Sequence, residues 1–446
     1  MQRLSSKTDS YDILGFQGEG NFGTVLKCIK RSSGELVAIK THKKNVRRWE
    51  VENELRMLTA LTEVDSERCH IVRFYEYFYV FNKCCLAFEY MEQSLFEFQK
   101  KNSFSPLPIR HIRTISIQVL KALYKLKELS IIHTDLKPTN IMLVDQGIFP
   151  FRVKVIDFGS ASKHNKVQNI KGSYIQTRYY RAPEVILGLP FSEKVDMWSL
   201  GCIMSELHLG RPLYPGRNEH EQISYICDTQ GMPNSNLLTK GCKATNFFTR
   251  ERNNNMDIIW QLKSMDQYQM ETKGTPLKKR NFILQSLDQM ALLNAPKAPY
   301  TNNEALAECE DLNHMVHLIK VMLTWDSQER ISPLTAITHP YITLMEMKRK
   351  YTNTKYFQFC MQSLKDSFNK DESEQYSKWE ENYDVQDHHD YCCGETKQNI
   401  TSMDSHQQNI SKKVNLSSGT SKNNSVAGKA HILVKDLPPS RKVSFI

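Results

Sequence analysis

The chain has 446 residues and a mass of 51.9 kDa, and 40% of its residues are hydrophobic and 24% charged. This length exceeds that of one ordinary domain, and the composition is that of a soluble globular protein rather than of a wholly disordered chain. No run of about 18 apolar residues occurs, so the sequence predicts no membrane-spanning helix. The first residues lack the apolar core of a secretory signal, which predicts a protein of the reducing cell interior.

The eleven cysteines and the net charge of +10 narrow the function classes further. The cysteines are odd in number and never spaced as CxxC, so neither a disulfide framework nor a zinc site is predicted. The basic residues form only short clusters, which favours solvated faces or phosphate contacts over a nucleic-acid groove. Since no DNA-recognition element is found either, we expect no direct nucleic-acid binding.

Composition divides the chain near residue 343. Before this point apolar runs alternate with Gly and Pro, and after it Ser, Asn, Gln, Lys, Asp and His dominate. We therefore predict a mostly disordered tail over 343–446. The first 90 residues predict a strand-rich region with one helix, and the residues from about Leu107 to Ile342 a mainly helical region. A cleft between two such regions is a common ligand site.

The strand-rich region contains five predicted strands and one predicted helix. The helix is predicted over Arg47–Leu61, because apolar residues recur there at helical spacing. The predicted strands are Tyr11–Gln17, Gly23–Lys30, Glu35–Lys40, Phe74–Val80 and Cys84–Glu89.

A glycine-rich turn joins the first two strands and reads Gly18-Glu19-Gly20-Asn21-Phe22-Gly23, with Val25 behind it. Glycine lets the backbone approach phosphate oxygens closely and present N–H groups to them. The same spacing also marks dinucleotide-binding folds, and flexible hairpins carry it by chance. A dinucleotide fingerprint opens into a helix, whereas this turn continues as a strand, which favours a loop that covers phosphates.

A lysine, Lys40, ends the apolar third strand Val-Ala-Ile-Lys. Such a lysine is usually a surface residue, but this one can reach back to phosphates under the glycine-rich turn. It would then need a carboxylate partner. Glu54 lies on the apolar stripe of the following helix and therefore faces inward, whereas Glu50 and Glu52 are expected in solvent.

The most informative segment is His133-Thr134-Asp135-Leu136-Lys137-Pro138-Thr139-Asn140. It could be an ordinary polar loop, but 17 residues after its last member an apolar strand ends in Asp157, followed by Phe-Gly. Phosphoryl transfer needs such a set: a carboxylate that orients and deprotonates a hydroxyl, a cation near the moving phosphate, and oxygen ligands for Mg²⁺.

Together with Ala182-Pro183-Glu184, these motifs occur in the order and spacing of the eukaryotic protein kinases, which the chain resembles from about Tyr11 to Ile342. The resemblance implies the α+β class: a bilobal protein kinase fold, with a small β-rich N-lobe containing one key helix and a large, mainly helical C-lobe, followed by a disordered tail. The implied divisions are a short N-terminal extension (1–10), a kinase domain (11–342) and the tail (343–446). Within the kinase domain, the N-lobe is expected at about 11–90 and the C-lobe at about 91–342, with an insert at about 231–304.

The subfamily follows from the segment Ser173–Glu184 and from Leu187-Gly-Leu-Pro190, which resemble the homeodomain-interacting protein kinases. These belong to the CMGC group, close to the dual-specificity tyrosine-regulated kinases, and the insert fits that group. Phe88-Glu-Tyr-Met-Glu-Gln93 is similar to the family's hinge. Thr134 replaces the arginine that most kinases carry before the catalytic aspartate, as in this family. Thr139 departs from the family's usual glutamate, which weighs against a preference for basic residues upstream of the target site.

The resemblance implies the role of each site residue. Asp135 is the expected catalytic base, with Lys137 beside it, while Asn140 and Asp157 are expected to hold Mg²⁺. Asp196 resembles the buried anchor of the catalytic loop, Arg330 resembles the partner of Glu184, and Phe88 resembles the gatekeeper behind adenine. The residues expected to bind ATP are Gln17, Gly18, Glu19, Gly20, Asn21, Phe22, Gly23, Val25, Ala38, Lys40, Glu54, Glu89, Met91 and Leu143.

The resulting hypothesis is a serine/threonine protein kinase that uses ATP and Mg²⁺ and first phosphorylates its own Tyr174, with Arg178 and Arg181 neutralising the phosphate. The expected targets are Ser/Thr-Pro sites in protein substrates, transcription factors and co-regulators among them, in the nucleus or also the cytoplasm, with no membrane partner. The main alternative is a catalytically weak kinase-fold scaffold that recruits partners, which predicts loss of Lys40, Asp135 or Asp157, and all three are present. A small-molecule kinase would lack the Arg-Ala-Pro-Glu segment.

Overall fold

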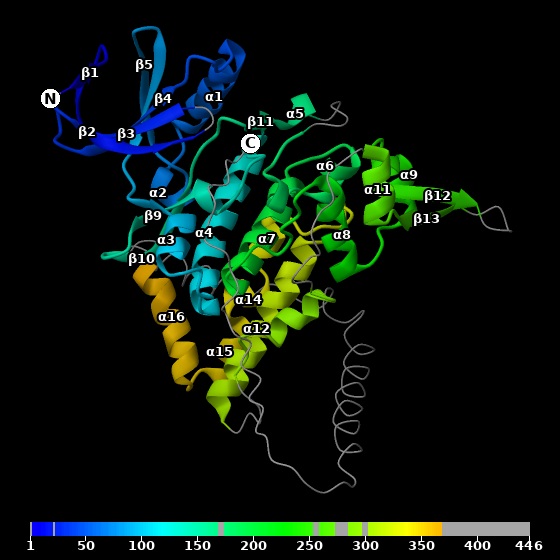
Figure 1. Cartoon of the computed structure of the whole chain (residues 1–446). Coiled ribbons are helices and arrows are strands. Elements are labelled where there is room, and N and C mark those ends of the chain that lie inside the picture. The colour runs from blue at the N-terminus through cyan, green and yellow to red at the C-terminus, as the bar shows by residue number, and fades with distance from the viewer. Residues whose placement is uncertain are drawn as a thin grey trace, which may run out of the picture. The chain divides into compact units, whose positions relative to one another are not determined.

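The chain folds into a strand-rich N-lobe and a larger helical C-lobe, as the computed structural model in Figure 1 shows. The structure describes residues 2–20, 23–167, 174–252, 258–272, 284–296 and 302–367. No helix in these described ranges combines the length and apolar character needed to cross a membrane.

An antiparallel sheet of six strands forms the N-lobe, in the order β1-β2-β3-β4-β6-β5. All five predicted strands are confirmed, two of them with the predicted bounds. The additional strand β1 lies within the predicted N-terminal extension and pairs with β2, so this extension is part of the N-lobe sheet. The strands are β1 (Arg3–Ser5), β2 (Ser10–Glu19), β3 (Gly23–Lys30), β4 (Leu36–His42), β5 (Phe74–Val80) and β6 (Lys83–Glu89).

Side-chain alternation along β4 explains how this sheet carries both a core and a site. Val37 and Ile39 are fully buried in an apolar cluster with residues of β2, β3, β5 and β6. Ala38 and Lys40 point to the opposite face, because successive side chains of a strand alternate between faces. The predicted helix is confirmed as α1 (Arg48–Leu61), in which Glu54 is buried while Glu52 is exposed.

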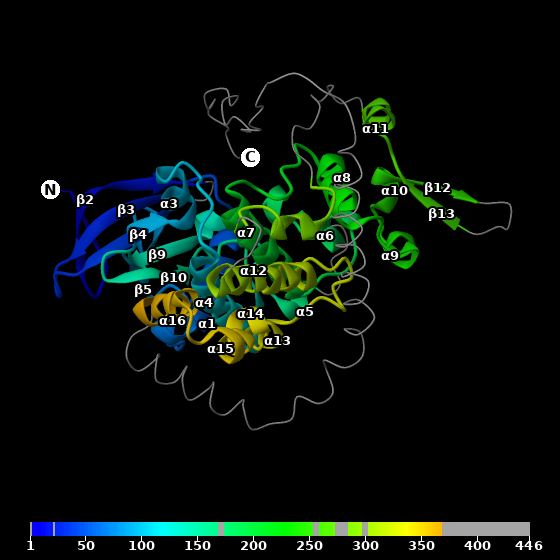
Figure 2. The same cartoon turned by 90° about the horizontal axis from the view of Figure 1, so that it is seen from below.

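The C-lobe is built around α7 (Lys194–Leu209), in which nearly every residue is buried. Helices α4 and α12 pack against α7 and help to cover it (Figure 2). The other helices are α2 (Ser66–Cys69), α3 (Leu95–Lys101), α4 (Ile109–Glu128), α5 (His164–Val167), α6 (Pro183–Leu187), α8 (Glu219–Gln230), α9 (Ser235–Lys240), α10 (Ala244–Phe247), α11 (Met265–Thr272), α12 (Asn303–Met322), α13 (Pro333–Ile337), α14 (Pro340–Thr343), α15 (Met345–Tyr351) and α16 (Lys355–Ser367).

Short strands and 3₁₀ turns of the C-lobe hold the polar motifs. The antiparallel pair β9–β10 follows the segment that begins at His133, and β10 ends two residues before Asp157. The short strands are β7 (Gln93–Ser94), β8 (Ile131–Ile132), β9 (Ile141–Asp145), β10 (Phe149–Val155), β11 (Ser162–Lys163), β12 (Phe248–Arg252) and β13 (Ile258–Leu262). The 3₁₀ turns are η1 (Pro138–Asn140), η2 (Arg178–Tyr180) and η3 (Leu287–Ala291).

The tail boundary predicted at residue 343 is wrong, because helices α15 and α16 follow it. Helix α16 packs against α4 and β10 (Figure 1). Its apolar residues Phe357, Cys360 and Leu364 are buried at helical spacing, which an average over the polar tail composition conceals. The rest of the predicted tail, from residue 368 onward, lies outside the described residues.

Candidate functional site

Three charged side chains from three elements meet between the lobes. Lys40 Nζ lies 2.6 Å from Glu54 Oε1 and 2.8 Å from Asp157 Oδ1, so the lysine partner predicted from the helix pattern is present. Burial lowers the pKa of Lys40, but the negative charges of Asp157 and Glu54 outweigh burial and raise this pKa above its usual value. Burial likewise raises the pKa of Asp157, but Lys40 lowers it to about 2. The site therefore holds a charged lysine between two ionised carboxylates.

Sequence reasoning missed His42, which completes this cluster. Its Nε2 lies 2.9 Å from the second oxygen of Glu54, and both side chains are buried. The contact helps to hold the Glu54 carboxylate in the orientation that serves Lys40. Since His42 lies two residues after Lys40 on β4, the period of two in a strand was the signal that could have found it.

The Asp135 carboxylate is held by Lys137 and Thr177. Lys137 Nζ lies 2.6 Å from Asp135 Oδ2, and both the backbone N–H and the hydroxyl of Thr177 donate to Oδ1, at 3.0 and 2.8 Å. Lys137 also donates to the Thr177 hydroxyl at 3.1 Å. The sequence analysis includes Thr177 in the segment before Ala182 but assigns it no role, because nothing in its spacing links it to a loop 42 residues earlier.

The loop that carries Asp135 is anchored from below by Asp196 at the start of α7. Its two oxygens accept the backbone N–H groups of His133 and Thr134 at 2.8 and 3.0 Å, as the resemblance implies. Burial raises the pKa of Asp196 to about 6. Thr134 has a left-handed backbone with φ of 65° and donates its hydroxyl at 2.6 Å to the carbonyl of Ser160, near the start of the activation segment (residues 157–184).

The two predicted metal ligands are brought together by backbone pairing. Asn140 ends η1 directly before β9, and its carbonyl accepts the N–H of Ile156, the residue before Asp157, at 3.0 Å. The Asn140 amide nitrogen donates to the Asp135 carbonyl at 2.9 Å, which orients the amide oxygen. A carboxylate and an amide oxygen form a donor set that suits a hard divalent cation, so the residues present fit such an ion.

The glycine-rich turn and the hinge line the roof and back of the same site. A Cβ on Gly23 would lie 2.6 Å from the Thr41 carbonyl oxygen, so close pairing of β3 with β4 requires glycine here.

The other residues expected around the nucleotide lie on the neighbouring strands. Val25 pairs with Lys40 in the β3–β4 register, Ala38 pairs with Phe88 of β6, and Leu143 is buried in β9. Gln17 donates to the carbonyl of Glu92 at 3.1 Å, Glu19 forms an ion pair with Lys43 at 2.7 Å, and Met91 is buried. The predicted loop residues Asn21 and Phe22 lie outside the described residues.

Tyr174 lies on the activation segment beside the two arginines predicted to serve it. Its side chain is 66% exposed, and the Arg181 guanidinium lies 4.0 Å from the centre of its ring. A hydrogen bond from Arg181, together with the charges of Arg181 and Arg178, lowers the pKa of Tyr174. Arg181 itself is buried, and it donates to the carbonyls of Ile175 and Gln176 and to Glu219.

The end of the activation segment is fixed by the ion pair predicted between Arg330 and Glu184. Two parallel contacts of 2.7 and 2.8 Å join the guanidinium to the carboxylate, and both side chains are almost completely buried. The guanidinium also lies over the ring of Trp198 at 5.2 Å. The end of this segment is therefore tied to the central helix α7, which carries Trp198.

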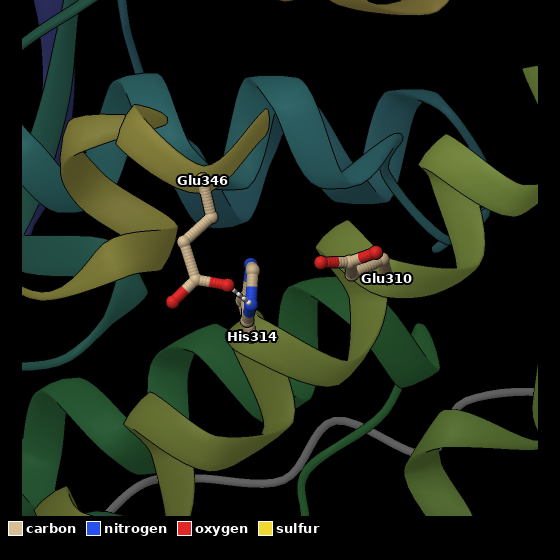
Figure 3. A group of neighbouring side chains, drawn as sticks. All are labelled: Glu310, His314 and Glu346. Carbon is tan, nitrogen blue, oxygen red and sulfur yellow. Dashed lines mark ion pairs between the residues drawn. The ribbon is translucent and has the colours of Figure 1, made fainter. Parts of the chain in front are cut away.

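A second group of potential metal ligands lies away from this site, on α12 and α15. It consists of Glu310, His314 and Glu346, and Figure 3 shows Glu346 pointing toward His314, with 3.3 Å between the paired atoms. The two oxygens of Glu310 already accept from Lys350 at 2.6 Å and from Tyr351 at 2.8 Å. The ammonium group of Lys350 competes with a metal cation for the Glu310 carboxylate. The contacts of this group therefore connect α12 to α15 and do not form a metal site.

Comparison with known proteins agrees with this geometry. The family model of the protein kinase domain matches residues 11–342, roughly three quarters of the chain. The chain belongs to the protein kinase family, and the bilobal kinase fold predicted from its motifs is confirmed. Protein kinases in general use ATP and a divalent metal ion.

Homeodomain-interacting protein kinases are among the relatives found by this comparison, which confirms the resemblance drawn from the activation segment and the hinge. Human homeodomain-interacting protein kinase 4 is 52% identical over 370 residues, which cover 82% of this chain and 60% of the relative. The mouse homeodomain-interacting protein kinases 1 and 2 are 45% and 44% identical over 364 residues, and these cover 81% of this chain and 30% of each relative. The chain thus spans well under two thirds of the length of these relatives.

Proposed function

We propose that this protein kinase transfers the γ-phosphate of ATP to serine or threonine hydroxyls of protein substrates. The observation that carries the proposal is the placement of Asp135. Its carboxylate is fixed by Lys137 and Thr177 on an anchored loop, in the same site as the Lys40–Glu54–Asp157 cluster. The test is phosphate transfer by the purified chain to a basic protein, followed by analysis of the modified amino acids. Label on phosphotyrosine alone contradicts the serine/threonine assignment.

The proposed reaction divides the work among these residues. The substrate hydroxyl donates a hydrogen bond to Asp135, its oxygen attacks the γ-phosphorus, and the bond from phosphorus to the ADP oxygen breaks. The hydroxyl proton passes to Asp135 and then to water, while Lys137 stabilises charge on the transferred group. Lys40, held by Glu54, binds the α- and β-phosphates. The glycine-rich turn offers backbone N–H groups to the phosphates.

Asp157 and Asn140 are the residues proposed to hold Mg²⁺ in this site. A bound divalent ion neutralises phosphate charge during transfer. The chain's own contribution is to orient both ligands, through the contact of Lys40 with Asp157 and the bond from Asn140 to the Asp135 carbonyl.

Adenine is proposed to lie between Val25 and Ala38 above and Leu143 below. The backbone carbonyl of Glu89 and the backbone of Met91 would then supply its hydrogen bonds. Phe88 would close the pocket behind the base, since its ring is half-buried and packs on Phe74 with centroids 5.4 Å apart.

Replacing Phe88 by glycine should therefore admit bulky adenine analogues that the parent excludes. We expect an analogue with a large group on the exocyclic amine to inhibit Phe88→Gly but not the parent, measured as inhibition of phosphate transfer. Phe81→Gly is the matched control, because Phe81 is 96% exposed in the β5–β6 turn. Equal inhibition of all three proteins would show that the pocket is misplaced.

We propose that phosphorylation of Tyr174 in cis activates the enzyme. A phosphate adds a charge of roughly −1.5 to −2 and three acceptor oxygens. Arg181 already lies against the ring and Arg178 is close enough to influence the hydroxyl, so both can bind the phosphate without moving far. Since Thr134 replaces the usual arginine, this pair supplies the positive charge that orders the segment.

Mass spectrometry on protein expressed in bacteria tests this step. We expect phosphate on Tyr174 in the parent and none in an Asp157→Ala variant, since the variant loses a proposed metal ligand and with it the reaction. An unmodified Tyr174 in a protein that transfers phosphate at full rate would overturn the activation mechanism and leave the kinase activity standing.

Serine or threonine followed by proline is the proposed target sequence, in nuclear regulatory proteins. The names of the relatives describe kinases that interact with homeodomains. The resemblance to the CMGC group would place Arg181 beside the position for the residue after the target. A degenerate peptide library should show faster modification of peptides with the following proline. Equal use of peptides with and without it would contradict the preference. Nuclear residence and transcription-factor partners are part of the same proposal.

A further inference from the structure

The side chain of Lys154, on the strand that leads to Asp157, is completely buried against the hinge residue Glu89. It belongs to β10, three residues before Asp157, and none of its side-chain surface is exposed. Its ammonium group donates to both oxygens of Glu89 at 2.8 and 2.7 Å, to Glu67 at 2.6 Å and to the Ser66 hydroxyl at 2.9 Å. Burying an ammonium group is costly unless such partners compensate it, so this arrangement holds its members in place.

The partner Glu89 is the hinge residue proposed to accept the exocyclic amine of adenine. Its backbone N–H donates to the Arg73 carbonyl at 3.1 Å, and its carboxylate accepts the Arg73 N–H at 2.5 Å and the Ser66 hydroxyl at 3.2 Å. These contacts and the Lys154 ion pair hold both the carboxylate and the backbone N–H of Glu89. They set the direction in which its carbonyl oxygen points.

Removal of the ammonium group would change this arrangement in a definite way. The carboxylates of Glu67 and Glu89 both bind the same nitrogen, and without it two negative charges would face each other in a partly buried place. Their repulsion would move the Glu89 side chain, and with it the hinge carbonyl. A displacement well below 1 Å already weakens a hydrogen bond whose distance and angle are set by the backbone.

We propose that Lys154 is a positioning residue for adenine recognition, which acts by holding Glu89 from behind. The same side chain joins the hinge to β10, the strand that leads to Asp157, so the base and the phosphates are held by connected elements. This inference rests on the proposed function, because it requires adenine at the hinge. Nothing in the motifs points to Lys154, since a lysine within Val-Lys-Val-Ile-Asp reads as a solvent-facing strand residue.

The test compares ATP with inosine triphosphate, which lacks the exocyclic amine and cannot donate to the Glu89 carbonyl. For the Lys154→Met variant of the full chain we expect kcat/KM with ATP to fall roughly 3- to 10-fold, the range for loss of one hydrogen bond. We expect the change to lie mainly in KM, and kcat/KM with inosine triphosphate to change little. The preference for ATP should therefore shrink.

Arg152→Met is the matched control. Arg152 is a second buried cation of β10 and pairs with Glu67 at 3.1 Å, so its loss disturbs the same strand. We expect it to reduce the activity with both nucleotides by the same factor. Glu89→Gln is the companion variant, because it keeps the size of the side chain but replaces one of the two oxygens that accept from Lys154 by an amide nitrogen that cannot accept. We expect it to shrink the preference for ATP as Lys154→Met does, and it decides the matter if Lys154→Met does not fold.

The possible outcomes distinguish failure of the positioning role of Lys154 from failure of the proposed kinase function. The positioning role would be overturned if Lys154→Met kept the parental ratio of ATP activity to inosine triphosphate activity. If that variant does not fold, the same result in Glu89→Gln would overturn it. Either result would show that the ion cluster is purely structural. A parent chain that transfers phosphate from neither nucleotide would overturn the proposed function instead.

Discussion

The Asp135→Asn variant is expected to transfer phosphate at least about 10²-fold more slowly than the parent, since general-base catalysis contributes on this scale. Asparagine keeps the shape of the side chain and can still accept a hydrogen bond from Thr177. It cannot take the hydroxyl proton, and it removes the negative charge that Lys137 binds at 2.6 Å. Because these losses concern the reacting hydroxyl rather than the nucleotide, kcat should fall while KM for ATP stays close to that of the parent.

Initial rates of phosphate transfer to a basic protein, at several ATP concentrations, measure this effect. Asp266→Asn is a suitable control because Asp266 is exposed in α11, and it should match the parent. Near-parental kcat in Asp135→Asn would remove the catalytic base from this loop and favour the weak-scaffold alternative.

Much of the candidate site could be predicted because kinase chemistry depends on residues in short linear motifs. The Lys40–Glu54 contact followed from two periods, that of a strand for the lysine and that of a helix for the glutamate. Two further contacts were expected only from the resemblance: that of Asp196 with the loop that carries Asp135, and that of Arg330 with Glu184. Spacing alone does not pair residues that lie 146 positions apart, as Arg330 and Glu184 do. For these residues the sequence carried the necessary information.

The unpredicted contacts are those between residues whose separation along the chain follows no period. Thr177 reaches Asp135 across 42 positions and Lys154 reaches Glu89 across 65, and both are ordinary polar residues in their local sequence. Such contacts are set by how the lobes and loops pack, which local patterns do not encode. They are also where the structure adds function, by orienting the proposed base and the hinge.

The fold shows the same division. Strands and α1 were predicted because alternating or helical apolar spacing is strong over 7 to 14 residues. Helix α16 was not predicted, although its apolar residues recur at regular helical spacing, because the polar composition of the sequence after residue 343 predicted disorder there. Tyr356 of α16 donates its hydroxyl at 2.6 Å to Asp311 of α12, whose other oxygen forms an ion pair with Arg113 of α4.

Loss of the buried Arg330 side chain should cause the largest change in stability. We expect Arg330→Met to lower the free energy of unfolding by about 3–5 kcal/mol, the usual cost of breaking a buried ion pair from one side. The guanidinium is 0% exposed and the Glu184 side chain 2%, so the remaining carboxylate would be buried without its cation. The bonds from Arg330 to the carbonyls of Thr324 and Lys194 are lost as well.

Urea unfolding of the parent and of Arg330→Met gives the difference in their free energies of unfolding. A common dependence of this free energy on urea concentration is used only if both transitions have the same slope. Arg48→Met is the control for removal of an arginine, because Arg48 is 92% exposed and its pair with Glu52 should contribute less than about 1 kcal/mol. A loss in Arg330→Met no larger than that of the control would contradict the burial argument.

The double variant Arg330→Met/Glu184→Leu distinguishes the cost of an unpaired charge from the cost of lost packing. Removing the carboxylate also removes its desolvation penalty, so the double variant should be more stable than Arg330→Met alone. Phosphate transfer should nevertheless stay low in both, because Glu184 lies in the first turn of α6 at the end of the activation segment and Arg330 ties this segment to α7. Recovered stability without recovered activity would assign the ion pair to the placement of the peptide-docking segment, whereas recovery of both would assign it to folding alone.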